Sequence, residues 1–165
     1  MTIVYIGLGS NLDDPDVQIE QAVIQLGQLT KTKFVAVSSL YSSKPMGPQD
    51  QPDYMNAVAC IDTMLTPIEL LDQLQAIELS FGRIRKDERW GARVLDLDIL
   101  LFGDQVINNE RLTIPHYGMK VREFVIYPLA ELNSNLVLPD GTNVSNLKIQ
   151  LDDNGLFVVR KLQLL

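Results

Sequence analysis

The apolar pattern of the chain predicts an α+β fold whose elements follow the order β-α-β-β-α-β. Four stretches are rich in β-branched and apolar residues, and two others repeat apolar residues at helical spacing. Loops that contain proline and glycine separate these stretches. This is the order of the ferredoxin-like split βαβ arrangement, in which we expect the helices on one face of an antiparallel sheet. With 165 residues, 46% of them apolar, the chain can bury a core as one domain, residues 1–165.

The first half of the pattern is a strand, a helix and a second strand. Residues 2–8 are apolar and β-branched, which predicts a buried strand. Asp14 is expected to cap a helix over residues 15–29, where apolar residues recur every three or four positions. Residues 34–41 are predicted to form the next strand, and the proline-rich stretch 43–53 is predicted to be a loop.

The second half repeats this plan. Residues 54–62 predict a strand, and a helix follows in which Thr66 and Glu69 have the spacing of a capping box. Gly82 is expected to end this helix. After a polar loop, residues 94–102 predict the fourth strand.

The sequence leaves residues 103–165 without a definite assignment. Prolines divide this stretch into segments that predict short helices and turns. Its last part fits either a helix or a hairpin around Asn154 and Gly155.

Charge and composition restrict the class of protein. The chain has 14 basic and 21 acidic residues, a net charge of −7 that disfavours a nucleic-acid partner. It has one cysteine, Cys60, no apolar run long enough to cross a membrane and no basic leader, so we expect a cytoplasmic monomer without a membrane partner. Residues 83–122 nevertheless contain eight of the basic residues, which indicates binding of a local anion or, alternatively, a solvated charged loop.

Asp96 and Asp98 are the most informative pair. Side chains on a strand alternate between faces, so both aspartates are expected on one face, with α-carbons about 6.5–7 Å apart. The other face is expected to carry Leu95, Leu97, Ile99 and Leu101. Two carboxylates at this spacing suit Mg²⁺, which takes the rest of its ligands from water and phosphates. The alternative is the polar face of an edge strand.

An arginine-rich loop, residues 82–93, directly precedes the strand that carries the two aspartates. Arginine guanidinium groups can donate two hydrogen bonds to phosphate oxygens. Sites of phosphoryl transfer commonly combine a metal ion with such arginines. Glycines at both ends, Gly82 and Gly91, allow the loop to act as a lid, and Trp90 would help to exclude water. The alternative is a mobile surface loop.

Three further features are less specific. His116, the single histidine, cannot build a zinc site but could donate to a phosphate or make a structural hydrogen bond. The run 7–11 (GLGSN) lacks the lysine and spacing of a phosphate-binding loop and is predicted to be a strand-to-helix turn. Cys60 lies in a predicted strand without an activating base, which favours a packing role.

Several longer motifs then point to one family. They are P-x-G-P-x-D-Q-P-x-Y-x-N at residues 45–56, G-R-x-R at 82–85, R-W-G-x-R-x-L-D-L-D at 89–98 and L-x-x-P-H at 112–116. Over about residues 2–140 the chain resembles the 6-hydroxymethyl-7,8-dihydropterin pyrophosphokinases. The resemblance implies an enzyme of folate synthesis in which the hydroxymethyl oxygen of the pterin attacks the β-phosphorus of ATP and AMP leaves.

The resemblance also implies roles for individual residues. It implies two Mg²⁺ ions held by Asp96 and Asp98, with Arg83 and Arg93 completing the catalytic set. ATP, the co-substrate, would be bound by Gln75, Glu78, Arg85, Trp90, Arg93, Ile99, Arg111, Thr113, His116, Tyr117 and Arg122. The pterin would be bound by Ser43, Lys44, Met46, Tyr54, Asn56, Asp96 and Phe124, with the rings of Tyr54 and Phe124 on either side of it. Ser43 stands where the family often has threonine, and we expect a small effect because that contact is largely through the backbone.

Two other classes are compatible with parts of the sequence. One is another Mg²⁺-dependent nucleotidyl or phosphoryl transferase on the same core, which release of ADP instead of AMP would reveal. The other is a ligand-binding regulatory or RNA-binding module. RNA binding would place aromatic and basic residues on the sheet face, where this sequence places Asp96 and Asp98.

Overall fold

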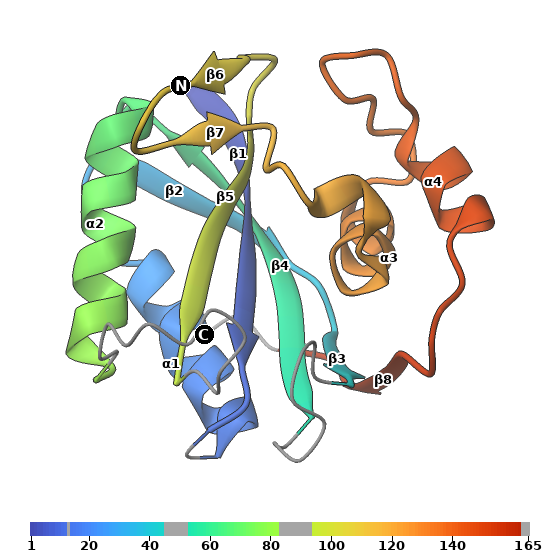
Figure 1. Ribbon diagram of the computed structural model, residues 1–165. Helices are drawn as coiled ribbons and strands as arrows, with labels where there is room; N and C mark the ends of the chain where they lie inside the picture. Colours follow the sequence, from blue (N-terminus) through green and yellow to red (C-terminus); the bar gives the residue numbers. More distant parts are fainter. Residues whose placement is uncertain (13, 45–52, 83–93, 163–165) are drawn as a thin grey trace.

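The computed structural model describes residues 1–12, 14–44, 53–82 and 94–162, and its centre is a six-stranded antiparallel sheet (Figure 1). The strands run in the order β5-β1-β4-β3-β8, and β2 also pairs with β4. Their bounds are β1 Thr2–Ser10, β2 Thr32–Val37, β3 Leu40–Ser43, β4 Tyr54–Thr63, β5 Asp96–Phe102 and β8 Phe157–Arg160. Two short strands, β6 Ile107–Asn108 and β7 Thr113–Ile114, form a separate hairpin. The predicted α+β, ferredoxin-like fold class is confirmed.

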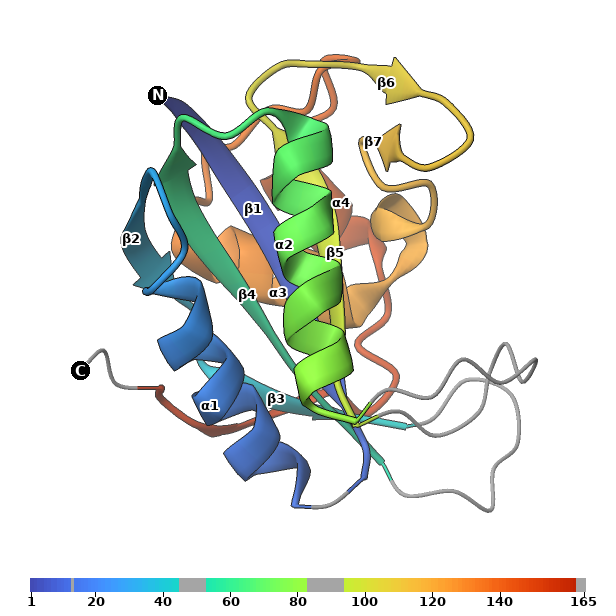
Figure 2. The ribbon, with the colours of Figure 1, turned by 90° about the vertical axis from the view of Figure 1, so that its left-hand side faces the viewer.

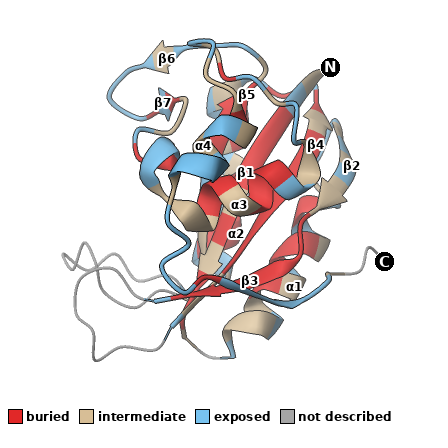
Figure 3. Ribbon diagram, turned by 90° about the vertical axis from the view of Figure 1, so that its right-hand side faces the viewer, coloured by how far each residue is buried: buried red, intermediate tan, exposed pale blue. Residues whose placement is uncertain are grey.

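The two helices predicted from the sequence share one face of the sheet, as expected, and further helices cover the other face. Helices α1 (Pro15–Leu26) and α2 (Pro67–Ser80) lie against the first face (Figure 2). Helix α3 (Glu123–Leu132) lies against the second face, and α4 (Val144–Gln150) packs on α3 (Figure 3). A short 3-10 turn, η1 (Met119–Val121), leads into α3. The second layer comes from the part of the chain that the sequence left unassigned.

The core is therefore divided by the sheet into two clusters. Leu97 and Ile99 of β5 pack into the cluster under α1 and α2. Leu100 and Leu101 both pack into the cluster under α3, because a bulge inserts one extra residue of β5 opposite β1. The prediction that Leu101 shares the face of Leu97 and Ile99 is consequently wrong.

Two predicted element boundaries also differ. The single strand expected over 34–41 is interrupted at Ser38, whose hydroxyl accepts a hydrogen bond from the Val58 backbone N–H. Asp14 has a left-handed conformation, with φ of 59°, and its side chain does not cap α1. The capping box of Thr66 and Glu69 is confirmed at the start of α2.

The C-terminal part of the chain adds an edge strand. Asn154 and Gly155 both have positive φ, which turns the chain after α4. Strand β8 then pairs with β3, and Arg160 at its end forms ion pairs with Asp16 and Glu20 of α1. Neither alternative expected for the last part of the chain forms as stated: the chain does turn at Asn154 and Gly155, but the strand that follows pairs with β3 instead of closing a hairpin. No helix within the described residues is long and apolar enough to span a membrane.

Glu131 of α3 binds the segment that joins β2 to β3 and the first residues of β3, through Ser39 and Tyr41. Its carboxylate accepts hydrogen bonds from the Ser39 N–H at 3.0 Å, from the Ser39 hydroxyl at 3.0 Å and from the Tyr41 phenol at 2.6 Å. Burial raises the pKa of Tyr41, and the bond to Glu131 raises it further, so the phenol remains a donor throughout the neutral range. The start of α3 lines the cavity described below, and this anchor holds the other end of the same helix.

We expect Glu131→Ala to lower the free energy of unfolding by about 2 kcal/mol, because it leaves the Tyr41 phenol and the Ser39 N–H without their acceptor. Urea unfolding followed by circular dichroism measures the loss. Glu110→Ala, in the exposed β6–β7 loop, is the control and should change stability by less than about 0.5 kcal/mol. Equal losses in the two variants would show that Glu131 does not anchor the helix.

Candidate active site

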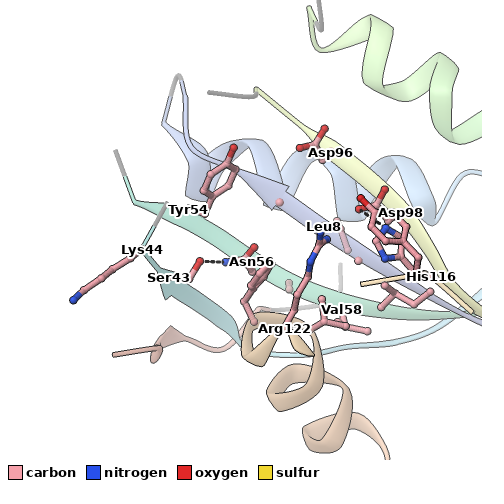
Figure 4. Close-up of a pocket in the computed structure, with 17 residues that line it drawn as sticks. Leu8, Ser43, Lys44, Tyr54, Asn56, Val58, Asp96, Asp98, His116 and Arg122 are labelled. Carbon is pink, nitrogen blue, oxygen red and sulfur yellow. Dashed lines mark hydrogen bonds and ion pairs between the residues drawn. The ribbon is translucent and has the colours of Figure 1, made fainter. Parts of the chain in front are cut away.

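A cavity of about 340 Å³ lies on the second sheet face, beside the first turn of α3 (Figure 4). Strands β1, β3, β4 and β5 supply its floor, and the segment from His116 to Val125 supplies a wall. The residues predicted from the sequence that line it are Ser43, Lys44, Tyr54, Asn56, Asp96, Asp98, His116, Tyr117, Arg122 and Phe124. The fold thus brings together residues that are up to about eighty positions apart in the chain.

Two glycines of β1 form the middle of the floor. Gly9 pairs with Asp96 on one side and with Asn56 on the other. Gly7 pairs in the same way with Asp98 and Val58. Because neither glycine has a side chain, the carboxylates of β5 and the amide of β4 border an open floor.

Neither glycine was predicted to belong to the site. The run 7–11 was predicted to be a turn, but β1 continues through Ser10 and only the following residues turn. Glycines two positions apart in a strand point to the same face, so their spacing was the signal that could have revealed the floor.

Asp96 and Asp98 lie on the cavity face of β5, as the alternation of the strand predicts. Asp96 is half-buried, and the side chain of Asp98 is 52% exposed. Carboxylate oxygens are the ligands that Mg²⁺ prefers. Within the described residues, no cluster of three histidine, cysteine or acidic side chains could enclose a metal. A pair of carboxylates at an open floor therefore fits an ion that takes its other ligands from water and phosphates.

His116 lies next to Asp98 and is held as a hydrogen-bond donor. Its Nδ1 accepts from the Gly118 N–H at 3.2 Å, which leaves the proton on Nε2, and Nε2 is 3.9 Å from Asp98 Oδ2. Burial lowers the pKa of His116 more than the Asp98 carboxylate raises it, and Arg122 lowers the pKa further. At neutral pH the ring is therefore uncharged and offers one N–H toward the carboxylate end of the cavity.

Arg122 brings a permanent positive charge over the aromatic wall. Its guanidinium carbon lies 5.6 Å from the centre of the Tyr117 ring and 5.8 Å from that of Phe124. The Tyr117 ring in turn stacks on His116, with centres 4.7 Å apart. The cavity therefore has a charged end near Asp98 and an aromatic and amide end near Tyr54 and Asn56.

A second group of predicted residues lies outside the cavity, near the outer edge of β5. Arg111 contacts Gln75 of α2 at 3.3 Å and forms an ion pair with Asp72 at 2.7 Å. Thr113 lies on β7, which contacts β5. Ile99 is 3% exposed and its side chain lies in the core, so only its backbone can contact a ligand.

Five predicted residues lie outside the described part of the chain. They are Met46, Arg83, Arg85, Trp90 and Arg93.

Glu78 of α2 holds the start of β5. It is 5% exposed, and its Oε2 accepts a hydrogen bond from the Leu97 N–H at 2.8 Å. Leu97 lies between Asp96 and Asp98, so this bond fixes the strand between the two carboxylates. Because N–H groups two residues apart point to the same edge, Ile99 presents its backbone N–H to that outer edge as well.

We expect Glu78→Ala to lower the free energy of unfolding by about 2 kcal/mol, since the buried Leu97 N–H loses its acceptor. Glu78→Gln retains an acceptor oxygen and should lose clearly less. Chemical denaturation of both variants measures the difference. Identical losses would mean that the charge of Glu78, and not its bond to β5, is what stabilises this region.

Comparison with known proteins shows the family of the chain. Residues 5–134 match the family model of 7,8-dihydro-6-hydroxymethylpterin-pyrophosphokinase (HPPK). The 2-amino-4-hydroxy-6-hydroxymethyldihydropteridine pyrophosphokinase of Haemophilus influenzae is 56% identical over 154 residues, covering 93% of this chain and 96% of that protein. The enzymes of the same name from Pseudomonas aeruginosa and Bacillus subtilis are 56% and 45% identical, covering 87% and 79% of this chain and 88% and 77% of those proteins.

Solved structures are similar in fold. The structure of HPPK-DHPS in complex with substrates has a TM-score of 0.70 at 11% identity, covering 91% of this chain. Plasmodium falciparum HPPK-DHPS A437G with pteroate has a TM-score of 0.71 at 13% identity, covering 90%. The chain spans less than half of each, 45% and 43%, and at these identities the likeness concerns the fold alone.

Proposed function

This chain belongs to the 7,8-dihydro-6-hydroxymethylpterin-pyrophosphokinase family, and from this premise we propose how its own residues perform the reaction. The enzyme transfers pyrophosphate from ATP to the hydroxymethyl group of 6-hydroxymethyl-7,8-dihydropterin and releases AMP, a step of tetrahydrofolate biosynthesis. The observation that best supports the residue assignments is the single cavity with two chemically different ends. We further propose that residues 1–165 act as one domain and as a cytoplasmic monomer.

The pterin occupies the aromatic and amide end. A flat heterocycle needs ring contacts above and below and a few hydrogen bonds in its plane. Tyr54, Asn56 and Phe124 all line the cavity, and we assign the two rings to the faces of the heterocycle and the amide to its edge. Ser43 and Lys44 border the same end of the cavity, and we assign Met46 of the adjoining loop to the pterin as well.

The polyphosphate of ATP occupies the charged end. Asp96 and Asp98 would hold Mg²⁺, and we propose two ions. When bound, Mg²⁺ offsets the charge of the phosphates, about −4 for ATP. His116 donates its N–H to a phosphate oxygen, while Arg122 supplies a fixed positive charge beside it.

The remaining nucleotide contacts are assigned to two places. Along the outer edge of β5 we assign ATP to Gln75, Glu78, Ile99, Arg111 and Thr113, and within residues 83–93 to Arg85 and Trp90. Tyr117, which borders the cavity, is assigned to ATP as well. Arg83 and Arg93 are proposed to stabilise the charge that develops as pyrophosphate is transferred.

Catalysis is then positioning combined with electrostatic stabilisation. The hydroxymethyl oxygen gives up its proton, for which we propose Asp96 as the acceptor, and attacks the β-phosphorus directly. The bond between that phosphorus and the oxygen of AMP breaks, and no covalent bond to the protein forms. Gly9, which has no side chain, lies between Asn56 and Asp96 and leaves room there for the reacting groups.

The reaction is tested by its co-product. With Mg-ATP and 6-hydroxymethyl-7,8-dihydropterin, we expect AMP and the pterin pyrophosphate in equal amounts, which chromatography of the nucleotides measures. Omitting the pterin is the control and should leave ATP intact. ADP as the product would instead assign the chain to the γ-phosphoryl transferases.

We expect Asp98→Ala to reduce turnover by at least about 100-fold, because it removes half of the carboxylate pair that holds the metal. Calorimetric titration should show weaker binding of Mg-ATP, while the binding of the pterin alone is retained. Asp104→Ala, an exposed aspartate in the turn after β5, is the matched control and should behave like the parent enzyme. Near-normal turnover of Asp98→Ala in saturating Mg²⁺ would rule out the metal role.

A further inference from the structure

We propose that Ser43 is a positioning residue for pterin recognition, because its hydroxyl holds the Asn56 amide in place on the cavity floor. The inference rests on the proposed pterin site and adds to it. The sequence led us to expect only a small, backbone-mediated contribution from Ser43, whereas its side chain makes a specific contact within the cavity.

The contact is short and buried. Asn56 Nδ2 donates to Ser43 Oγ at 2.7 Å, and each residue is 6% exposed (Figure 4). Ser43 pairs with Tyr54 across β3 and β4, and Tyr41 pairs with Asn56, so the two side chains meet diagonally on one sheet face. Both also line the cavity.

The other end of the amide is constrained as well. A Cβ placed on Gly9 would lie 3.5 Å from Asn56 Oδ1, so the carbonyl oxygen lies over the open floor formed by that glycine. The amide is therefore held with its nitrogen end toward β3 and its oxygen end toward β1 and β5. This orientation leaves the carbonyl oxygen and the second hydrogen of Nδ2 for a ligand.

The orientation of the amide matters because its acceptor oxygen and its donor nitrogen must face the opposite kind of group on the edge of the pterin ring. The pterin presents ring N–H donors and ring acceptors in a fixed order, and an amide matches that order in only one of its two flips. The reversed flip would set donor against donor and leave buried groups unpaired, which is the most effective way to reject a ligand. The Ser43 hydroxyl can accept from Nδ2 or donate to Oδ1, so it holds the amide beside the ligand in either flip, and the polar groups of the pterin edge then determine the flip that binds.

The test compares three variants of the full-length enzyme. Ser43→Ala removes the acceptor, Ser43→Thr retains a hydroxyl, and Ser42→Ala removes the hydroxyl of the neighbouring serine, which is buried to 4% exposure but does not line the cavity. We measure KM for the pterin, KM for ATP, kcat and the melting temperature of each variant. In addition, ¹⁵N-resolved NMR follows the side-chain amide protons of Asn56.

We expect Ser43→Ala to raise KM for the pterin about tenfold, with KM for ATP changed less than twofold. Ser43→Thr should restore the pterin KM, and Ser42→Ala should not change it. The amide protons of Asn56 should shift or broaden in Ser43→Ala alone. A merely structural role of Ser43 would instead lower the melting temperature and affect both substrates equally.

Failure of the proposal is distinct from failure of the proposed function. If the parent enzyme does not convert the pterin, the proposed function is wrong. If the parent enzyme is active and Ser43→Ala, still folded, has the same pterin KM, the positioning role is wrong. Loss of pterin affinity in both Ser43→Ala and Ser43→Thr would also overturn it, because the hydroxyl would then not be the determinant.

Discussion

The antiparallel register of β1 between β4 and β5 is the constraint on which the site depends. It places Gly9 between Asp96 and Asn56, and Gly7 between Asp98 and Val58. A shift of one residue would turn both carboxylates toward the apolar cluster under α1 and α2. That shift is costly because Leu97 and Ile99 would leave the core at the same time. The apolar half of β5 therefore fixes the position of its polar half.

The helix layer on the second face supplies the wall of the cavity whose floor the strand register sets. Helix α3 buries Ile126 and Leu129 against the sheet and brings Phe124 and Val125 to the cavity. Its first turn follows directly after Arg122, so the charged and the aromatic groups of the wall come from one short segment. The bulge in β5 serves the same layer, because it turns Leu100 and Leu101 together toward α3.

Local patterns predicted β1, β4, β5, the region of β2 and β3, the two N-terminal helices and the shared face of Asp96 and Asp98, because each depends on the spacing of a few neighbouring residues. The second helix layer could not be predicted in this way, since α3 is apolar on nearly all sides and its packing against Leu100 depends on contacts far apart in the chain. The break at Ser38 was missed for the same reason: the hydrogen bond to Val58 that stabilises it joins residues twenty positions apart. The glycine floor escaped notice because a glycine-containing run resembles a turn until its strand partners are known.

The placement of charge explains how an acidic protein can hold a polyphosphate. The net charge of −7 would repel ATP at long range, but the cavity wall supplies opposite charge locally through Arg122 and an uncharged N–H donor through His116. Keeping His116 neutral has a further consequence. A charged His116 would form an ion pair with Asp98, whereas the neutral ring leaves that carboxylate available to the Mg²⁺ that we propose there. Asp98 alone would favour a charged His116, but burial and Arg122 outweigh it, so the ring beside the carboxylate stays neutral.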